Sequence, residues 1–373
     1  MSPTLLARIR DRLRGTLPAE SPGARGTEHL ARNPECLRLR ALTIVGIKPA
    51  TAAKEIYRVD ANEGMSTFAL QRGVLFERRL LENGAARLLQ LYRSAGRLSV
   101  AESKVVNVED LAPGTHPIDM QRRRTETRRL FEAKLANDPG APNLIVKPRI
   151  PIGLLGVGHD IEPDVLVAAD EDRFYRPAEI KSYPDRAGKT DPADLRSIRR
   201  QAAVGVVALR QAGARLMNGV ESLVGAVGDL VLTKPQSFTP TLHPSALRGE
   251  VDSIERALAI APASLEEVAE IVGEDASLDR REVLDSIPNA YRQNCREHCA
   301  LAAECKRQAI RDGIPAILGD VAREELVVAG SIGRAIDLMN ERGRPPRNDE
   351  ERVLQERLAA ARRVIPRAVN RAG

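Results

Sequence analysis

The segment GHDIEPDVLVAADEDRFYRPAEIKSY, which spans Gly158–Tyr183, decides the predicted fold. It predicts two short strands joined by an acidic turn. The first strand carries Asp164, and the second carries Glu179 and Lys181 on either side of Ile180. Side chains alternate faces along a strand, so Glu179 and Lys181 share one face and Ile180 points to the other. Carboxylates and an ammonium group on one patch of a small sheet suit a divalent cation beside a phosphate better than they suit a core.

Further acidic residues at the start of the segment extend this prediction. Asp160, Glu162 and Asp164 are spaced two apart, so all three are expected on one face of the first strand. A surface hairpin with solvated charges is the alternative, and it accounts for the acidic turn at residues 170–172. It does not account for a carboxylate and a lysine that flank Ile180 opposite Asp164.

The composition is compatible with a polyanionic partner. The chain has 373 residues, enough for two domains or for one domain with large additions. Its net charge is +6, and a moderately basic protein attracts polyanions. There is no run of about 18 apolar residues, and the N-terminus, MSPTLLARIRDRLRG, is too charged for a secretory signal. We therefore expect a cytoplasmic protein that does not enter a membrane.

The central segment resembles the PD-(D/E)xK nuclease superfamily. The matching residues are Pro163 and Asp164, followed after fourteen residues by Glu179, Ile180 and Lys181. The resemblance implies an α/β, restriction-endonuclease-like core, in which helices flank a mixed central sheet. It also implies that Asp164, Glu179 and the Ile180 carbonyl bind Mg²⁺ or Mn²⁺. Lys181 would then orient or deprotonate the attacking water, or hold the phosphate.

A long helix is expected before the sheet, over residues 66–96, with Ser66 or Thr67 as its cap. Its GVLFE sequence resembles the superfamily element that offers a carboxylate to the metal. The resemblance therefore implies that Glu77 completes the metal ligands. A salt bridge between Glu77 and a nearby arginine is the alternative.

A second helix is expected from Asp191, which is a good N-cap, with Pro192 at the first position. Gln201 matches the glutamine of the Gln-x3-Tyr element of RecB-like nucleases, and the resemblance gives it a place near the active site. The tyrosine position holds Gly205, a departure that weakens assignment to that branch. Three arginines of this helix are expected to grip the DNA backbone: Arg196, Arg199 and Arg200. A basic helix at about 120–137 is a further candidate for backbone contact.

Four cysteines form a distinctive layout: Cys36, Cys295, Cys299 and Cys305. Clustered thiols in a cytosolic chain suit zinc or an iron–sulfur cluster. One cysteine before the core and three after it resemble the CRISPR-associated exonucleases and the AddB nuclease domain, which implies a structural 4Fe–4S cluster that joins the N- and C-terminal parts. The first pair of the trio is one residue wider than in those families. Zinc and ordinary free thiols are the alternatives.

Three regions are predicted: a basic arm and linker at 1–26, the nuclease core with its four-cysteine cluster at 27–310, and a basic helical extension at 311–373. We expect a Mg²⁺- or Mn²⁺-dependent deoxyribonuclease that acts in DNA repair, recombination or antiviral defence. Its expected partners are DNA and a helicase or other subunits of such a complex. The alternative is a catalytically silent nucleic-acid-binding or scaffold subunit.

Overall fold

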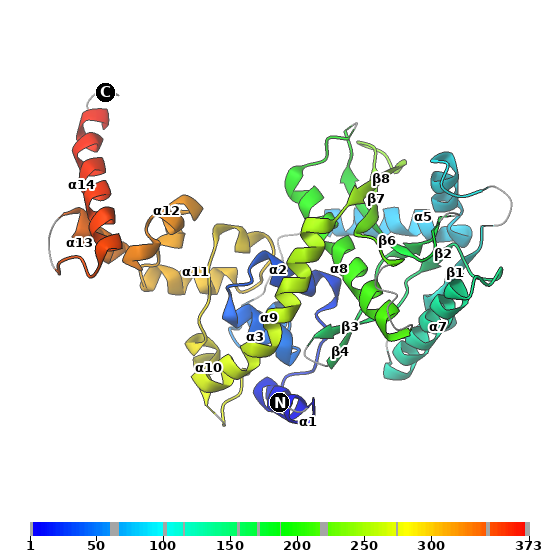
Figure 1. The fold of residues 1–373 in the computed structure, drawn as a ribbon, viewed down its shortest axis with the longest axis horizontal. Helices are drawn as coiled ribbons and strands as arrows, with labels where there is room; N and C mark the ends of the chain where they lie inside the picture. The colour runs from blue at the N-terminus through cyan, green and yellow to red at the C-terminus, as the bar shows by residue number, and fades with distance from the viewer. Residues whose placement is uncertain are drawn as a thin grey trace. The chain divides into compact units, whose positions relative to one another are not determined.

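A computed structural model describes residues 3–59, 67–99, 103–114, 116–154, 157–169, 172–186, 188–216, 223–273, 275–340 and 344–369. The chain divides into two compact units (Figure 1). The first comprises Met1–Lys48 and Met65–Ile287, and the second comprises Pro49–Gly64 and Pro288–Gly373.

A mixed six-stranded sheet forms the centre of the first unit. Its strands lie in the order β1 (Val105–Asn107), β2 (Leu144–Val146), β5 (Val165–Val167), β6 (Arg176–Pro184), β7 (Val227–Thr233) and β8 (Pro240–Ala246). The β1–β2 and β6–β7 pairs are parallel, and the remaining pairs are antiparallel. The predicted α/β class, with helices around a mixed sheet, is therefore confirmed.

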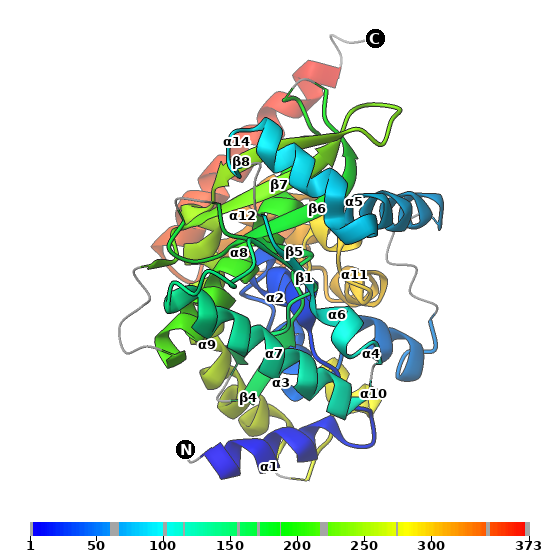
Figure 2. The same ribbon diagram turned by 90° about the vertical axis from the view of Figure 1, so that its right-hand side faces the viewer.

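Two long helices cover opposite faces of this sheet, as Figures 1 and 2 show: α5 (Thr67–Ser94) and α8 (Pro192–Leu216). Phe76 and Leu80 of α5 pack in one cluster with Ala178 and Ile180 of β6. On the α8 side, Gly205 lies so close to the sheet that a Cβ there would meet Pro177 at 2.8 Å. Alternation along β6 thus sends Ile180 into the core beneath α5, as predicted.

The helix predicted over residues 66–96 is interrupted. Glu82–Ala85 leave helical geometry, and the last three of these residues have φ angles of 54°, 66° and 57°. Asparagine and glycine tolerate such left-handed angles better than other residues, so Asn83 and Gly84 make the break possible. The prediction of one continuous helix was wrong, and α5 is two helical segments (Figure 2). Ser66, one of its two predicted caps, lies outside the described residues.

The first strand of the central segment was also predicted wrongly. The chain forms two strands there, β4 (Val157–Ile161) and β5, which belong to different sheets. β4 pairs only with β3 (Ile150–Leu154) in a separate two-stranded sheet. Pro163 lacks a backbone N–H and restricts the residue before it, which explains why the strand ends there. Asp160 and Glu162 therefore do not share a strand face with Asp164.

The other helices of the first unit are α1 (Pro3–Arg14), α2 (Gly23–Arg32), α3 (Leu37–Val45), α6 (Val108–Leu111), α7 (Pro117–Leu135), α9 (Arg248–Val272) and α10 (Arg281–Ser286). The α2 helix packs against α8 and α9, and α3 packs against α9. The N-terminal segment is attached to this unit, because the Leu278 N–H donates to the Leu13 carbonyl at 2.7 Å.

The second unit is helical in its described residues. It contains α4 (Pro49–Glu55), η2 (Gln293–Glu297), α11 (Ala302–Arg311), η3 (Pro315–Leu318), α12 (Asp320–Glu325), η4 (Val327–Ala329), α13 (Ile332–Met339) and α14 (Asp349–Val369). Glu351 is fully buried between Arg334 and Arg347, and these guanidinium groups lower its pKa.

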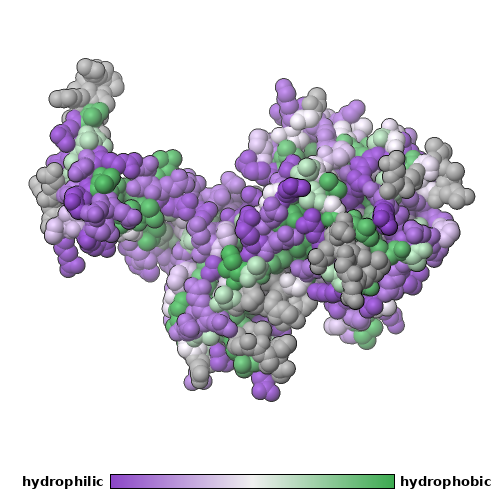
Figure 3. Space-filling model, in the orientation of Figure 1, coloured by the Kyte–Doolittle hydropathy of each residue, from purple (hydrophilic) through white to green (hydrophobic). Residues whose placement is uncertain are grey.

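None of the helices in the described part of the chain is long and apolar enough to cross a membrane. The face of the molecule in Figure 3 is mainly hydrophilic, with hydrophobic residues scattered between charged ones.

Candidate cation and phosphate site

Three of the predicted residues converge where β5 and β6 lie side by side. The Lys181 Nζ lies 3.2 Å from the Asp164 Oδ2 and 3.1 Å from the Glu179 Oε2. The Ile180 N–H donates to the same Asp164 oxygen at 2.9 Å. The antiparallel register, in which Val165 faces Ala178, places Asp164 beside Glu179. Two carboxylates therefore share one ammonium group, as the geometry of the central segment predicted.

These groups are shielded from solvent to different degrees. The Glu179 side chain is 5% exposed, the Asp164 side chain 13% and the Lys181 side chain 25%. The site thus opens to solvent on the side of Lys181, while Glu179 lies beneath the surface. Because electrostatic interactions are stronger away from water, the protonation states of these groups depend strongly on one another.

The pKa values of the two carboxyl groups move in opposite directions. Burial raises the pKa of Glu179 to about 7, assisted by the neighbouring Asp164 carboxylate and opposed by Lys181. Burial acts in the same direction on Asp164. The Lys181 and Lys147 ammonium groups and the Ile180 N–H outweigh it, however, and lower the pKa of Asp164 to about 2. Asp164 is therefore ionised at neutral pH, whereas Glu179 titrates there.

Lys181 stays protonated under these conditions. Its burial disfavours the charged form, but the Asp164 and Glu179 carboxylates outweigh that effect and raise the pKa of Lys181 well above its ordinary value. A permanently charged ammonium group can hold a phosphate or orient a water molecule. As long as no metal is bound, the charged form is favoured, which suits these electrostatic roles better than that of a general base.

A second lysine, Lys147, completes the site and was missed by sequence reasoning. It follows β2 directly, has a φ angle of 50°, and its Nζ lies 3.4 Å from the Asp164 Oδ1. The same ammonium group forms an ion pair with Glu77 of α5. The sequence offered one signal for Lys147, its position directly after a buried apolar strand. That position does not show which strand lies beside β2, and it is this neighbour that brings Lys147 to Asp164.

Glu77 thus reaches the site through Lys147. Its predicted salt bridge exists, although the partner is a lysine and not an arginine. Within the described ranges, no three His, Cys, Asp or Glu side chains lie close enough to hold a metal ion. Asp164 and Glu179 are consequently the pair of oxygen donors on which a cation site depends, and Glu77 joins them only if it leaves Lys147.

The predicted residues at the start and in the middle of α8 differ in the contacts that they make. Asp191 caps the helix as predicted, since its Oδ1 accepts from the Ala193 N–H at 2.8 Å. Gln201 donates to the Ser197 Oγ at 3.3 Å within the same helix. The close approach of Gly205 to Pro177 explains why no tyrosine stands there: no side chain fits in that position.

The three arginines of α8 also differ. Arg199 binds Glu250 at 2.7 Å and the Ala246 carbonyl at 2.6 Å, so its guanidinium is used within the fold. The Arg200 Nη1 lies 4.0 Å from the Glu28 carboxylate. Arg196 is exposed and forms no ion pair with the described residues, and it is the arginine of this group most available to a ligand.

None of the four cysteines, all of which lie in the described part of the chain, forms a disulfide, and Cys299 is less buried than the other three. Cys36 precedes α3 in the first unit, while the other three lie around η2 and the start of α11 in the second. Burial raises the pKa of Tyr291, as do the nearby Cys295 and Cys305 sulfur groups. Cys295 and Cys305 therefore lie near one hydroxyl group. Their predicted ligation of a cluster together with Cys36 stays a prediction.

Comparison of the chain with protein-family models, with curated proteins and with solved structures found no significant match. The geometry described above is therefore the basis for a functional proposal.

Proposed function

We propose that this chain is a divalent-metal-dependent deoxyribonuclease with a PD-(D/E)xK-type active site. One observation carries the proposal: Asp164, Glu179 and Lys181 come from adjacent strands and meet within hydrogen-bonding distance. A cluster of shielded carboxyl and ammonium groups is costly for a fold that gains nothing from it, because each ion loses hydration. Perturbed pKa values in such a cluster are typical of functional sites.

The donor set fits Mg²⁺ or Mn²⁺. Both ions prefer oxygen ligands, which Asp164 and Glu179 supply on one face of the sheet, and the Ile180 carbonyl is the proposed third ligand. The Lys181 ammonium group lies within 3.2 Å of both side chains, so the two carboxyl groups are close enough together to contact one cation. When bound, the metal would stabilise the negative charge that develops on the phosphate and increase the acidity of a water molecule.

The chain's own residues have separate tasks in this proposal. Asp164 is ionised throughout the physiological range and provides a fixed anchor for the cation. Glu179 must lose its proton before it can serve as a second anchor. Lys181 keeps its charge, so it holds a non-bridging phosphate oxygen or orients the attacking water by hydrogen bonding.

Cleavage assays test this proposal directly. The full chain is incubated with labelled single- and double-stranded DNA in Mn²⁺, in Mg²⁺ and in EDTA. We expect metal-dependent hydrolysis that Lys181→Ala abolishes and that Lys234→Ala, an exposed lysine beyond β7, leaves unchanged. Tight DNA binding without cleavage of any substrate would instead support the silent scaffold alternative.

We also propose that the cysteines ligate a structural 4Fe–4S cluster, with Cys295, Cys299 and Cys305 as three ligands and Cys36 as the fourth that the resemblance implies. Cys295 and Cys305 both lie near Tyr291, and the Cys299 N–H donates to the Cys295 carbonyl at 2.8 Å. Within the described residues the three thiol groups are not close enough together to hold a metal, so ligation requires them to move together. Iron and sulfide analysis and absorbance at about 400 nm test it. Stoichiometric zinc in colourless protein would establish the zinc alternative.

A further inference from the structure

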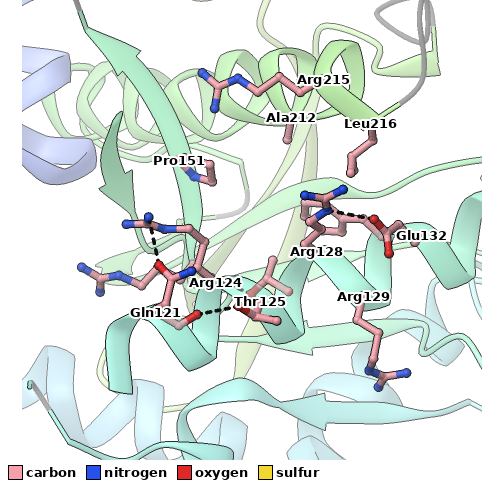
Figure 4. Close-up of a pocket in the computed structure, with 13 residues that line it drawn as sticks. Gln121, Arg124, Thr125, Arg128, Arg129, Glu132, Pro151, Ala212, Arg215 and Leu216 are labelled. Atoms are coloured by element: carbon pink, nitrogen blue, oxygen red, sulfur yellow. Dashed lines mark hydrogen bonds and ion pairs between the residues drawn. The ribbon is translucent and has the colours of Figure 1, made fainter. Parts of the chain in front are cut away.

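A hollow in the first unit lies between α7, β3 and the C-terminal end of α8 (Figure 4). Its volume is about 620 Å³. Glu132 is the single carboxylate among its lining residues, against five arginines: Arg124, Arg128, Arg129, Arg149 and Arg215. We call this hollow the arginine pocket. Arg124, Arg128 and Arg129 belong to the basic helix at about 120–137 that the sequence indicated as a candidate for backbone contact, whereas Arg149 and Arg215 were not selected from the sequence.

The arginines of the pocket are engaged to different extents. Arg124 and Arg149 bind the buried Asp160 carboxylate at 2.7 and 2.8 Å, which fixes their guanidinium groups in place. Arg129 pairs with Glu126 and points away from α8 in Figure 4. This leaves two arginines, on opposite walls, to receive a ligand.

Arg128 and Arg215 are those two. Arg128 pairs with Glu132 at 2.8 Å, but both side chains are more than half exposed, and exposed pairs are weak enough for a phosphate to replace the carboxylate. Arg215 is exposed and has no ion pair with any residue that the structure describes. The pocket therefore presents unsatisfied positive charge at its rim.

The interior of the pocket is apolar. Phe131 of α7, Pro151 of β3, and Ala212 and Leu216 of α8 all line it, and Figure 4 shows Ala212 and Leu216 extending from α8 toward α7. A small inorganic anion needs no such surface. An apolar floor with a cationic rim suits a nucleotide, whose base stacks or packs while its phosphates meet arginine.

The pocket is connected to the candidate cation site by the chain itself. Arg149, which lines the pocket, follows Lys147, which contacts Asp164, by two residues. Two residues span at most about 7 Å, and one strand of duplex DNA carries a phosphate about every 3.4 Å along the axis. A strand held at Asp164 can therefore reach the pocket within a few nucleotides.

We propose that the arginine pocket binds one nucleotide of the DNA strand that the candidate active site cleaves, with its base on the apolar floor and its flanking phosphates on Arg128 and Arg215. The statement that the bound nucleotide belongs to the cleaved strand rests on the proposed nuclease function. The statement that the pocket binds a nucleotide does not. The pocket then sets where along the strand the scissile phosphate lies.

Binding without metal separates the two ideas. Fluorescence anisotropy of a labelled oligothymidylate in EDTA compares the full-length wild type with the double variant Arg128→Ala/Arg215→Ala. We expect affinity to fall about tenfold, and the slope of log K against log salt to shrink by about 1.4 for two lost single-strand phosphate contacts. The matched control is Arg256→Ala, an exposed arginine of α9 outside the pocket, and it should bind within about twofold of wild type.

A second variant tests occupancy of the interior. Leu216→Trp fills the pocket and leaves its charges in place, so it should weaken binding as well, and thermal unfolding by circular dichroism confirms that each variant is folded. Wild-type affinity in both pocket variants would overturn the inference even if the enzyme cleaves DNA. Conversely, pocket-dependent binding by a protein that never cleaves DNA with Mn²⁺ would overturn the nuclease proposal and leave the pocket standing.

Discussion

Replacement of Lys181 by methionine should make the stability of the first unit depend more steeply on pH. The substitution keeps most of the side-chain volume and removes the ammonium group that lies 3.1 Å from Glu179 and 3.2 Å from Asp164. Breaking a buried ion pair costs about 3–5 kcal/mol. Lys181 is a quarter exposed, and Lys147 still contacts Asp164, so we expect about 2 kcal/mol at high pH.

The pH dependence follows from Glu179. Its pKa in the folded protein is raised from 4.5 to about 7, so the contribution of Glu179 to folding is largest below pH 4.5, and about 3 kcal/mol of that contribution is lost as pH rises through this interval. Without Lys181 the pKa of Glu179 rises further, and the loss continues above pH 7. The variant should therefore be destabilised less at pH 5.5, where only the contact with ionised Asp164 is lost, than at pH 8.5, where the loss should reach about 2 kcal/mol.

Urea unfolding in EDTA, followed by circular dichroism at these two pH values, measures the difference. Lys234→Met provides the control, because this exposed lysine lies in the turn after β7 and should change stability by less than about 0.5 kcal/mol at either pH. An equal loss of stability for Lys181→Met at both pH values would refute the coupling between Lys181 and Glu179.

Four further outcomes follow from the same contacts. Wild-type cleavage at a subsaturating Mn²⁺ concentration should rise between about pH 6 and pH 8 as Glu179 loses its proton and binds the metal, and Glu179→Gln should show no such rise in a pH–rate profile. Glu77→Gln should slow cleavage by about tenfold in single-turnover assays. The effect is moderate because Glu77 contacts Lys147, which in turn contacts Asp164. Gly205→Ala should lower the free energy of unfolding by about 1–3 kcal/mol through its clash with Pro177, whereas Gly249→Ala, with nothing within 4 Å, should not. Cys295→Ser should remove the absorbance at about 400 nm that a 4Fe–4S cluster gives, and an unchanged spectrum would contradict its assignment as a ligand.

Local rules were sufficient for several parts of the fold and site. Alternation along a strand placed Glu179 and Lys181 on one face and Ile180 in the core, because the side-chain period of a strand is fixed by backbone geometry. The start of α8 was predictable because the Asp191 side chain satisfies backbone N–H groups within three residues of itself. Such features depend on neighbours in sequence and need no knowledge of the tertiary structure.

Other features depend on which elements become neighbours. Lys147 reaches Asp164 because β2 pairs with β5, and nothing within a few residues of Lys147 specifies that pairing. Arg199 was expected to bind DNA, but α9 brings Glu250 to it from fifty-one residues away. Asp160 was placed on the wrong strand because two short strands separated by a proline have the same alternating pattern as one longer strand.

The charges around Asp164 indicate how the proposed cation site would be stable when empty and would still attract a cation. Asp164 and Glu77 carry two negative charges, which the Lys147 and Lys181 ammonium groups balance while Glu179 keeps its proton. Loss of that proton leaves one negative charge in a poorly solvated place, and a divalent cation compensates it better than water can. A bound cation in turn favours ionised Glu179, so cation binding and proton release are linked. Because the pKa of Glu179 is about 7 without a cation, cation affinity should rise with pH up to about 7 and level off above it.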